Sequence, residues 1–127
     1  MPHTILVAED DDLNRKLFGD LLALNGYHTL QAATGLDALR LARAHRPNLV
    51  LLNILLPDIS GLDVARHLKG DADLRHIPIL AVTGLAMPGD KQRILATGCN
   101  GYILKPIKVT SYLRTIERTL RAATRLS

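Results

Sequence analysis

The sequence predicts an α/β domain built on a parallel β-sheet. Five short apolar runs alternate with five amphipathic stretches along the 127 residues, which is the pattern of strands joined by crossover helices. This length is typical of one domain, so residues 1–127 are expected to form a single unit. The chain is 47% hydrophobic and only 3% aromatic, so it can bury a core that must be aliphatic.

The apolar runs locate the strands. Residues 49–52 and 79–82 are continuously apolar, as expected for central strands that are covered on both faces. Residues 28–32 form a more polar run, which is expected at an edge of the sheet. The two remaining strands are expected at 5–8 and 102–104.

Helical spacing and boundary residues define the segments between the strands. Gly26 is expected to end the first helix, Thr34 to open the second and Pro47 to follow its end, while Ser60 is a candidate N-cap for the third. The segment 87–97 has few apolar positions and is expected to form a short fourth helix. Apolar residues recur at helical spacing at Leu13, Leu17, Leu21 and Leu24, at Leu36, Leu39 and Ala42, at Leu62, Ala65 and Leu68, and at Val109, Leu113, Ile116 and Leu120.

Composition excludes several classes of protein. No stretch approaches the roughly 20 apolar residues that cross a bilayer, and the N-terminus lacks the pattern of a signal peptide, so a cytoplasmic location is expected. Cys99 is the single cysteine, which excludes an intramolecular disulfide and a thiolate metal cluster. The net charge is +4, and part of the positive charge lies on one side of the last predicted helix, at Arg114, Arg118, Arg121 and Arg125.

Polar residues follow four of the predicted strands. Glu9 and Asp10 come after the first, Asn53 after the third, Thr83 after the fourth and Lys105 after the fifth. Ligands of open parallel sheets bind beyond the carboxyl ends of the strands, so these side chains are expected to converge on one rim. The convergence of residues far apart in sequence is a stronger indication of a site than any one of them.

Each residue type suits a site for a phosphoryl group. Paired carboxylates at Glu9 and Asp10 supply oxygen ligands for Mg²⁺. Lys105 can pair with a phosphoryl oxygen, and the Thr83 hydroxyl can donate a hydrogen bond to one. The alternative for the acidic run is that it caps a helix N-terminus, a role that suits Asp11 or Asp12.

Six segments together resemble the receiver domains of response regulators, and in particular the single-domain DivK-type receivers of cell-cycle signalling. The resemblance covers essentially the whole chain and implies a (βα)₅ doubly wound, flavodoxin-like sheet with strand order 2-1-3-4-5. The segments that carry it are Glu9-Asp10, Leu13-Asn14-Arg15-Lys16-Leu17-Phe18, Leu56-Pro57-Asp58-Ile59-Ser60-Gly61-Leu62, Ile77-Pro78, Ala86-Met87-Pro88-Gly89-Asp90 and Lys105-Pro106-Ile107.

The resemblance also implies roles. Glu9 and Asp10 would hold Mg²⁺, Thr83 would be the switch hydroxyl, and Lys105, ahead of a cis peptide bond, would contact the phosphoryl group. A histidine kinase or phosphotransfer protein would donate that group, and a downstream signalling protein would read the result. The partner surface would be the fourth helix, fifth strand and fifth helix, with Tyr102, Lys108 and Tyr112.

The departure from the family pattern is at the acceptor position. Asn53 stands there, and an amide cannot form the acyl phosphate that a carboxylate forms. Its oxygen can still ligate Mg²⁺, so metal binding is expected to weaken with the loss of one charge. The chain is therefore expected to have no enzymatic activity and to signal by protein contacts, with its switch held in the inactive arrangement.

Two origins are consistent with Asn53. One is an engineered, non-phosphorylatable form of a working receiver, and the other is a natural pseudo-receiver that binds proteins without phosphorylation. The domain could also be cut from a larger hybrid kinase, although the start of the chain argues against this. A third function, nucleic-acid binding through the arginine side of the last helix, lacks an aromatic platform or a recognised motif.

Overall fold

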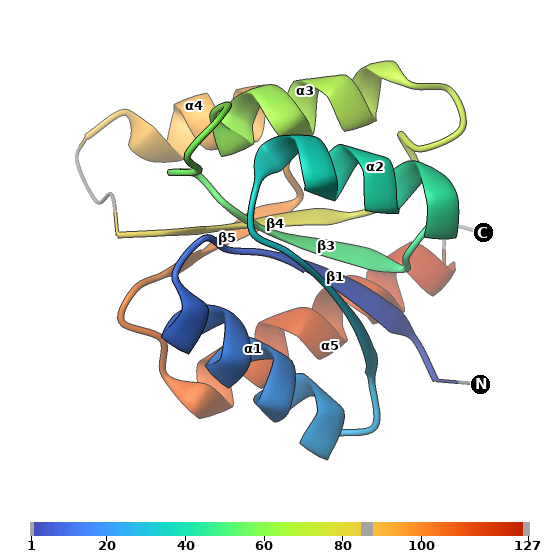
Figure 1. Cartoon of the computed structure of the whole chain (residues 1–127), viewed down its shortest axis with the longest axis vertical. Coiled ribbons are helices and arrows are strands. Elements are labelled where there is room, and N and C mark those ends of the chain that lie inside the picture. The colour runs from blue at the N-terminus through green and yellow to red at the C-terminus, as the bar shows by residue number, and fades with distance from the viewer. Residues whose placement is uncertain (1, 85–87, 126–127) are drawn as a thin grey trace.

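A computed structural model confirms the parallel α/β fold (Figure 1). The structure describes residues 2–84 and 88–125. All neighbouring strands pair in parallel, in the order β2-β1-β3-β4-β5, as the resemblance implied. The strands are β1 (Thr4–Ala8), β2 (His28–Ala32), β3 (Leu49–Asn53), β4 (Ile79–Thr83) and β5 (Gly101–Leu104), and the helices are α1 (Asp12–Leu24), α2 (Gly35–His45), α3 (Gly61–Gly70), α4 (Asp90–Ala96) and α5 (Val109–Arg125).

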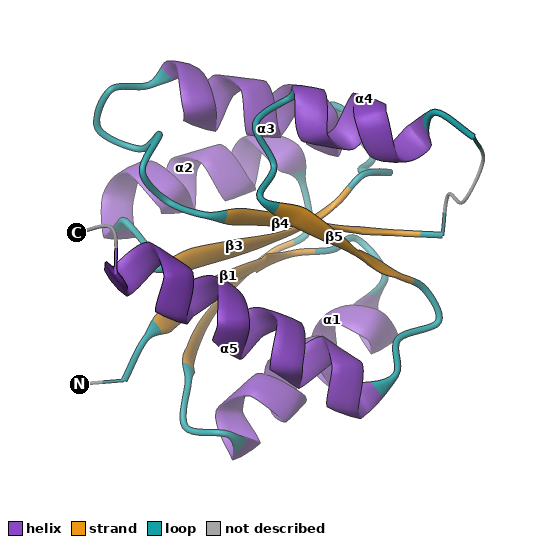
Figure 2. Ribbon diagram, turned by 180° about the vertical axis from the view of Figure 1, so that it is seen from behind, coloured by secondary structure: helices purple, strands orange, loops and turns teal. Residues whose placement is uncertain are grey.

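Helices cover both faces of the sheet. The helices α2, α3 and α4 lie on one face, and α1 and α5 lie on the other (Figures 1 and 2). Because successive side chains of a strand point to opposite faces, β3 contributes Val50 and Leu52 to one core and Leu49 and Leu51 to the other. This double coverage explains why β3 and β4 are continuously apolar and why the more polar β2 lies at an edge.

Local signals end and begin the helices as predicted. The Asp11, Thr34 and Ser60 side chains accept hydrogen bonds from the N–H groups of the first turns of α1, α2 and α3. Gly26 follows α1 with a φ of 87°, a conformation that glycine adopts without a steric penalty. The helix α4 is short, as predicted for 87–97, although Met87 lies outside the described residues.

The buried face of α1 differs from the one that the leucine spacing suggests. Leu13 and Leu24 are 80% and 82% exposed, whereas Phe18 and Leu22 are buried against the sheet. Apolar residues of α1 occur on more than one of its sides, so their spacing identifies the helix without showing which side faces the sheet.

None of the described helices has both the length and the apolar character needed to span a lipid bilayer.

Asp58 ties the loop after β3 to the start of α2. Its carboxylate accepts hydrogen bonds from the N–H groups of Leu36 at 2.9 Å and Gly35 at 2.8 Å. These two donors, with Leu36 the stronger influence, lower the pKa of the carboxyl below its ordinary value of 3.8. The interaction therefore joins the β3–α3 loop to α2 while the carboxyl is ionised.

The pH dependence of folding is expected to change when Asp58 is replaced by Asn. A pKa that is lower in the folded than in the unfolded chain stabilises the fold above the unfolded-state pKa, and that stabilisation is lost as the pH falls through the folded-state value. The Asp58→Asn variant lacks this titration, so its free energy of unfolding should fall less steeply in acid. Urea unfolding at a series of acidic pH values measures the difference, and parallel profiles for the two proteins would show that the interaction contributes nothing.

Candidate phosphoryl-acceptor site

The carboxyl ends of β1, β3 and β5 bring three of the predicted site residues into hydrogen-bond contact. Glu9 follows β1 and is only 1% exposed, Asn53 ends β3 at 7% exposed, and Lys105 follows β5. The Lys105 Nζ donates to Glu9 Oε1 at 2.7 Å and lies 3.4 Å from Asn53 Oδ1. The structure therefore brings these three predicted residues together on one rim.

The amide nitrogen of Asn53 is the centre of this site. Its Nδ2 lies 2.9 Å from Glu9 Oε2, 3.2 Å from Asp10 Oδ1 and 2.8 Å from the carbonyl oxygen of Leu55. An amide NH₂ carries two hydrogens, so two N–H donors are shared among three oxygens. Two carboxylates and one carbonyl thus converge on a neutral donor group.

The Lys105 side chain determines which way the amide faces. With Oδ1 toward Lys105 and Nδ2 toward the carboxylates, every contact joins a donor to an acceptor. The reverse orientation would place N–H groups against the Lys105 ammonium and Oδ1 against two carboxylates. The hydrogen-bond network therefore holds Asn53 in one orientation.

Glu9 has further partners that keep its carboxylate in place. Its Oε2 also accepts from the backbone N–H of Asp11 at 3.2 Å, and its backbone carbonyl accepts from the Arg15 guanidinium at 2.9 Å. A buried carboxylate costs little only when it is paired and hydrogen-bonded, and here Lys105, Asn53 and Asp11 provide those contacts.

The oxygens around Asn53 suit a divalent cation, but the amide as oriented does not. Mg²⁺ prefers carboxylate and carbonyl oxygens, which Glu9, Asp10 and Leu55 supply. The Asn53 N–H groups already occupy the point where those oxygens converge. Within the described residues, no group of three or more His, Cys, Asp or Glu side chains could hold a metal ion. These residues fit Mg²⁺ only if the Asn53 side chain rotates so that its Oδ1 faces the carboxylates and its N–H groups face the Lys105 ammonium.

Thr83 and the predicted partner residues Tyr102 and Lys108 differ in exposure. Thr83 ends β4 and is 2% exposed, and its backbone carbonyl accepts from the Lys105 N–H at 2.8 Å. Lys105 precedes the cis peptide bond to Pro106, as the resemblance implied. Tyr102 is half-buried on β5, and Lys108 is exposed just before α5.

The expectation that Tyr112 belongs to the partner surface is wrong. Its side chain is 0% exposed and packs on Phe18 of α1, with the ring centroids 5.6 Å apart. Its hydroxyl donates to the Phe18 carbonyl at 3.3 Å, and burial raises the pKa of the phenol. Tyr112 lies on the side of α5 that packs against the sheet and α1, so it is a core residue.

The arginine side of α5 is partly paired. Arg121 forms an ion pair with Glu117 one turn earlier at 2.6 Å, whereas Arg114 and Arg118 are exposed. Nothing is described of the Arg125 side chain. The pairing of Arg121 is typical of a solvated helix face.

Two participants in the site were not predicted from the sequence. The Leu55 carbonyl contacts Asn53, and a backbone oxygen has no signature in the residue type that carries it. Arg15 contacts the carbonyl of Glu9 from α1, and the only signal for it is its place within one helical turn after the acidic run.

Comparison with known proteins identifies the family. The model of the response regulator receiver domain matches residues 5–117. The polar-differentiation response regulator DivK of Brucella anthropi is 51% identical over 120 residues, covering 94% of this chain and 98% of the relative. The DivK of Brucella ovis is 49% identical with the same coverage of both chains.

Solved structures give the same result. A putative response regulator from Chloroflexus aurantiacus superposes with a TM-score of 0.91 at 26% identity, covering 95% of this chain and 99% of its own. The receiver domain of a sensor histidine kinase from Pseudomonas aeruginosa, which has a magnesium ion coordinated in its active-site cleft, superposes with a TM-score of 0.87 at 30% identity, covering 94% and 98% of the two chains. This chain therefore belongs to the response regulator receiver domain family and is of the DivK type.

Proposed function

We propose that this protein is a two-component signalling receiver that acts through protein contacts and cannot be phosphorylated at its acceptor position. The observation that carries the proposal is the side chain of Asn53, which stands at the end of β3 in hydrogen-bond contact with Glu9, Asp10 and Lys105. A neutral amide oxygen is not the nucleophile that a carboxylate is, and the acyl phosphate of this family requires a carboxylate.

The hydrogen bonds of the site support a switch held in one arrangement. The Asn53 amide gives the buried Glu9 and the neighbouring Asp10 the donors that they need, and Lys105 supplies a positive charge. A ligand shifts a conformational equilibrium only by its difference in affinity for the two states. With no phosphoryl group attached, Thr83 and Tyr102 have no new interaction to favour a second arrangement.

The partners that fit this proposal are the proteins that receiver domains contact. A histidine kinase or phosphotransfer protein would dock at the rim without transferring its phosphoryl group, and a downstream protein would bind the surface around Tyr102 and Lys108. We propose no enzymatic activity for the chain, and a weakened affinity for Mg²⁺. The proposal holds for an engineered and for a natural Asn53, since both have the same chemistry.

Amide spectra of the ¹⁵N-labelled chain test this proposal. Acetyl phosphate with Mg²⁺ is expected to leave the resonances of Thr83 and Tyr102 unchanged in this chain and to shift them in its Asn53→Asp variant. The Asn53→Ala variant is the matched control, because it removes the amide without providing a carboxylate, and it should not respond. A phosphodonor-dependent shift at Thr83 and Tyr102 in the unaltered chain would show that the switch is not held.

A further inference from the structure

The loop between β3 and α3, residues 54–60, is closed at its base beside the acceptor position. The Gly61 N–H donates to the Ile54 carbonyl at 2.8 Å, which joins the two ends of the loop. Gly61 permits this close return of the backbone, because a Cβ atom there would lie 2.1 Å from the carbonyl oxygen of Asn53. The loop therefore leaves and rejoins the rest of the fold next to Asn53.

The tip of the same loop is bound to the start of α2. The Asp58 Oδ1 accepts from the Gly35 N–H at 2.8 Å, and its Oδ2 accepts from the Leu36 N–H at 2.9 Å. N–H groups in the first turn of a helix have no acceptor within the helix, and a negative charge is favourable beside them. Because both carboxylate oxygens are used, the Asp58 side chain is held in one orientation relative to α2.

Packing brings the tip of the loop and the start of α2 together at the same point. A Cβ atom at Gly35 would lie 2.5 Å from the Cγ1 of Ile59, so the Ile59 side chain rests directly on this glycine. Leu56 and Ile59 are partly buried and pack against the core on this face of the sheet. The burial of apolar side chains is not directional, whereas the two hydrogen bonds of Asp58 are, so Asp58 defines where the tip lies.

The loop presents the carbonyl group of Leu55 to the acceptor position. The Leu55 oxygen accepts from Asn53 Nδ2 at 2.8 Å, the shortest of the three contacts of that nitrogen. The Leu55 side chain is 70% exposed, so its own packing does not fix the backbone there. The position of this carbonyl instead follows from the closed base of the loop on one side and the bound tip, at Asp58, on the other.

We infer that Asp58 is a positioning residue for the acceptor site, because it fixes the loop to α2 and thereby holds the Leu55 carbonyl against the side chain at position 53. The inference rests on the proposed function for the identity of that position. The hydrogen bonds of Asp58 go to α2, so it acts on the site through the loop. Residues that orient the groups of a site in this way commonly change its metal affinity by about 10- to 100-fold when they are replaced.

Solvent exchange of the Asn53 side-chain NH₂ hydrogens tests the inference on the full ¹⁵N-labelled chain, without Mg²⁺ or a phosphodonor. Asp58→Asn keeps the size of the side chain and replaces one acceptor oxygen by an NH₂ group, which cannot accept from an N–H. The exchange at Asn53 is expected to become roughly threefold faster or more, because the hydrogen bond to the Leu55 carbonyl is weakened. An unchanged exchange rate in Asp58→Asn would overturn the inference.

Two controls separate positioning from a general effect on the fold. Asp37→Asn removes the same charge from the first turn of α2, where Asp37 pairs with Arg40, and should leave the exchange at Asn53 unchanged. Backbone exchange at the buried strand residues Leu51 and Leu80 reports opening of the whole domain in the same samples. It should not change in Asp58→Asn. Acceleration at these core residues equal to that at Asn53 would mean that Asp58 only stabilises the fold, and would contradict the inference.

A second readout uses the Asn53→Asp variant, in which the Leu55 carbonyl and three carboxylates can ligate Mg²⁺. Adding Asp58→Asn to this variant is expected to raise the dissociation constant of Mg²⁺ about tenfold, measured by titration of the amide resonances, whereas adding Asp37→Asn should not change it. Equal dissociation constants with and without Asp58 would contradict its role. A failure of the Asn53→Asp variant itself to bind Mg²⁺ would count against the proposed function, and the exchange at Asn53 then decides the inference by itself.

Discussion

Replacing Asn53 by aspartate is expected to make the stability of this domain depend on Mg²⁺. The substitution removes two N–H donors and adds a negative charge beside Glu9 and Asp10, to which the amide now donates at 2.9 and 3.2 Å. Without a cation, the free energy of unfolding of the variant should fall by about 1–3 kcal/mol, because the Glu9 and Asp10 carboxylates and the Leu55 carbonyl lose the N–H donors of Asn53. Three carboxylates and the Leu55 carbonyl then form an oxygen site that suits Mg²⁺.

Urea unfolding with and without Mg²⁺ measures this effect. At a Mg²⁺ concentration about 100 times its dissociation constant, the Asn53→Asp variant should gain about 2.7 kcal/mol by mass action. The unaltered chain should gain much less, because the Asn53 Oδ1 must first turn away from Lys105 and toward the carboxylates before it can act as a ligand. Asn53→Ala serves as the control without an added charge. Equal stabilisation of the unaltered chain and the aspartate variant would contradict the orientation of the amide.

The second large effect is expected for Tyr112→Ala. The ring is fully buried between α5 and the sheet and stacks on Phe18, so its removal leaves a cavity beneath two helices. Aromatic-to-alanine substitutions in a core typically cost about 3–5 kcal/mol, which is a large part of the stability of a small domain. Tyr112→Phe keeps the ring and removes only the 3.3 Å hydrogen bond to the Phe18 carbonyl, and should cost about 1 kcal/mol.

Chemical denaturation of both Tyr112 variants checks this prediction, with Lys108→Ala as the control. Lys108 is exposed on the loop before α5, and its substitution should change the free energy of unfolding by no more than about 0.5 kcal/mol. A cost below about 1 kcal/mol for Tyr112→Ala would contradict the buried position. If partner binding falls in this variant, the cause is expected to be folding, since the side chain does not reach the surface.

The strands of this fold could be predicted because their signal is local. A strand covered on both faces must be apolar at every position, and β3 and β4 satisfy that condition in the sequence itself. The rotation of a helix about its axis depends on the sheet that it covers. For that reason the leucine spacing located α1 without showing which of its sides faces the sheet, and an aromatic residue of α5 was assigned to the surface when it lies in the core.

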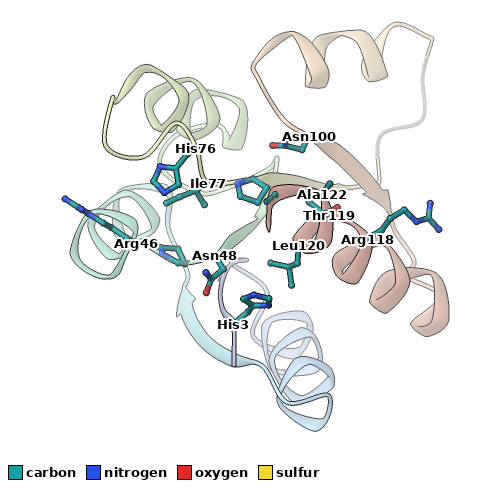
Figure 3. A pocket seen from close by; sticks show the side chains of 13 residues that line it. His3, Arg46, Asn48, His76, Ile77, Asn100, Arg118, Thr119, Leu120 and Ala122 are labelled. Carbon is teal, nitrogen blue, oxygen red and sulfur yellow. The ribbon is translucent and has the colours of Figure 1, made fainter. Parts of the chain in front are cut away.

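The acceptor rim could be predicted because polar residues at the carboxyl ends of parallel strands must meet. Glu9, Asn53 and Lys105 were placed together in this way. The contact of the Leu55 carbonyl could not be predicted, because every residue has a carbonyl group and only the path of the chain brings this one to Asn53. A cavity at the end of the sheet where the strands begin is lined by residues that precede β1, β3, β4 and β5 and by the end of α5 (Figure 3), and no single segment of the sequence carries its signal.

The most direct test of this account is phosphoryl incorporation from acetyl phosphate with Mg²⁺, measured by intact mass on this chain and on its Asn53→Asp variant. The account predicts that only the aspartate variant gains one phosphoryl group, because Glu9, Asp10, Thr83 and Lys105 remain in place and the nucleophile alone is missing. Incorporation into the unaltered chain would contradict the block at Asn53. Incorporation into neither protein would contradict the claim that the rest of the site is competent, and would favour a pseudo-receiver that has lost the chemistry altogether.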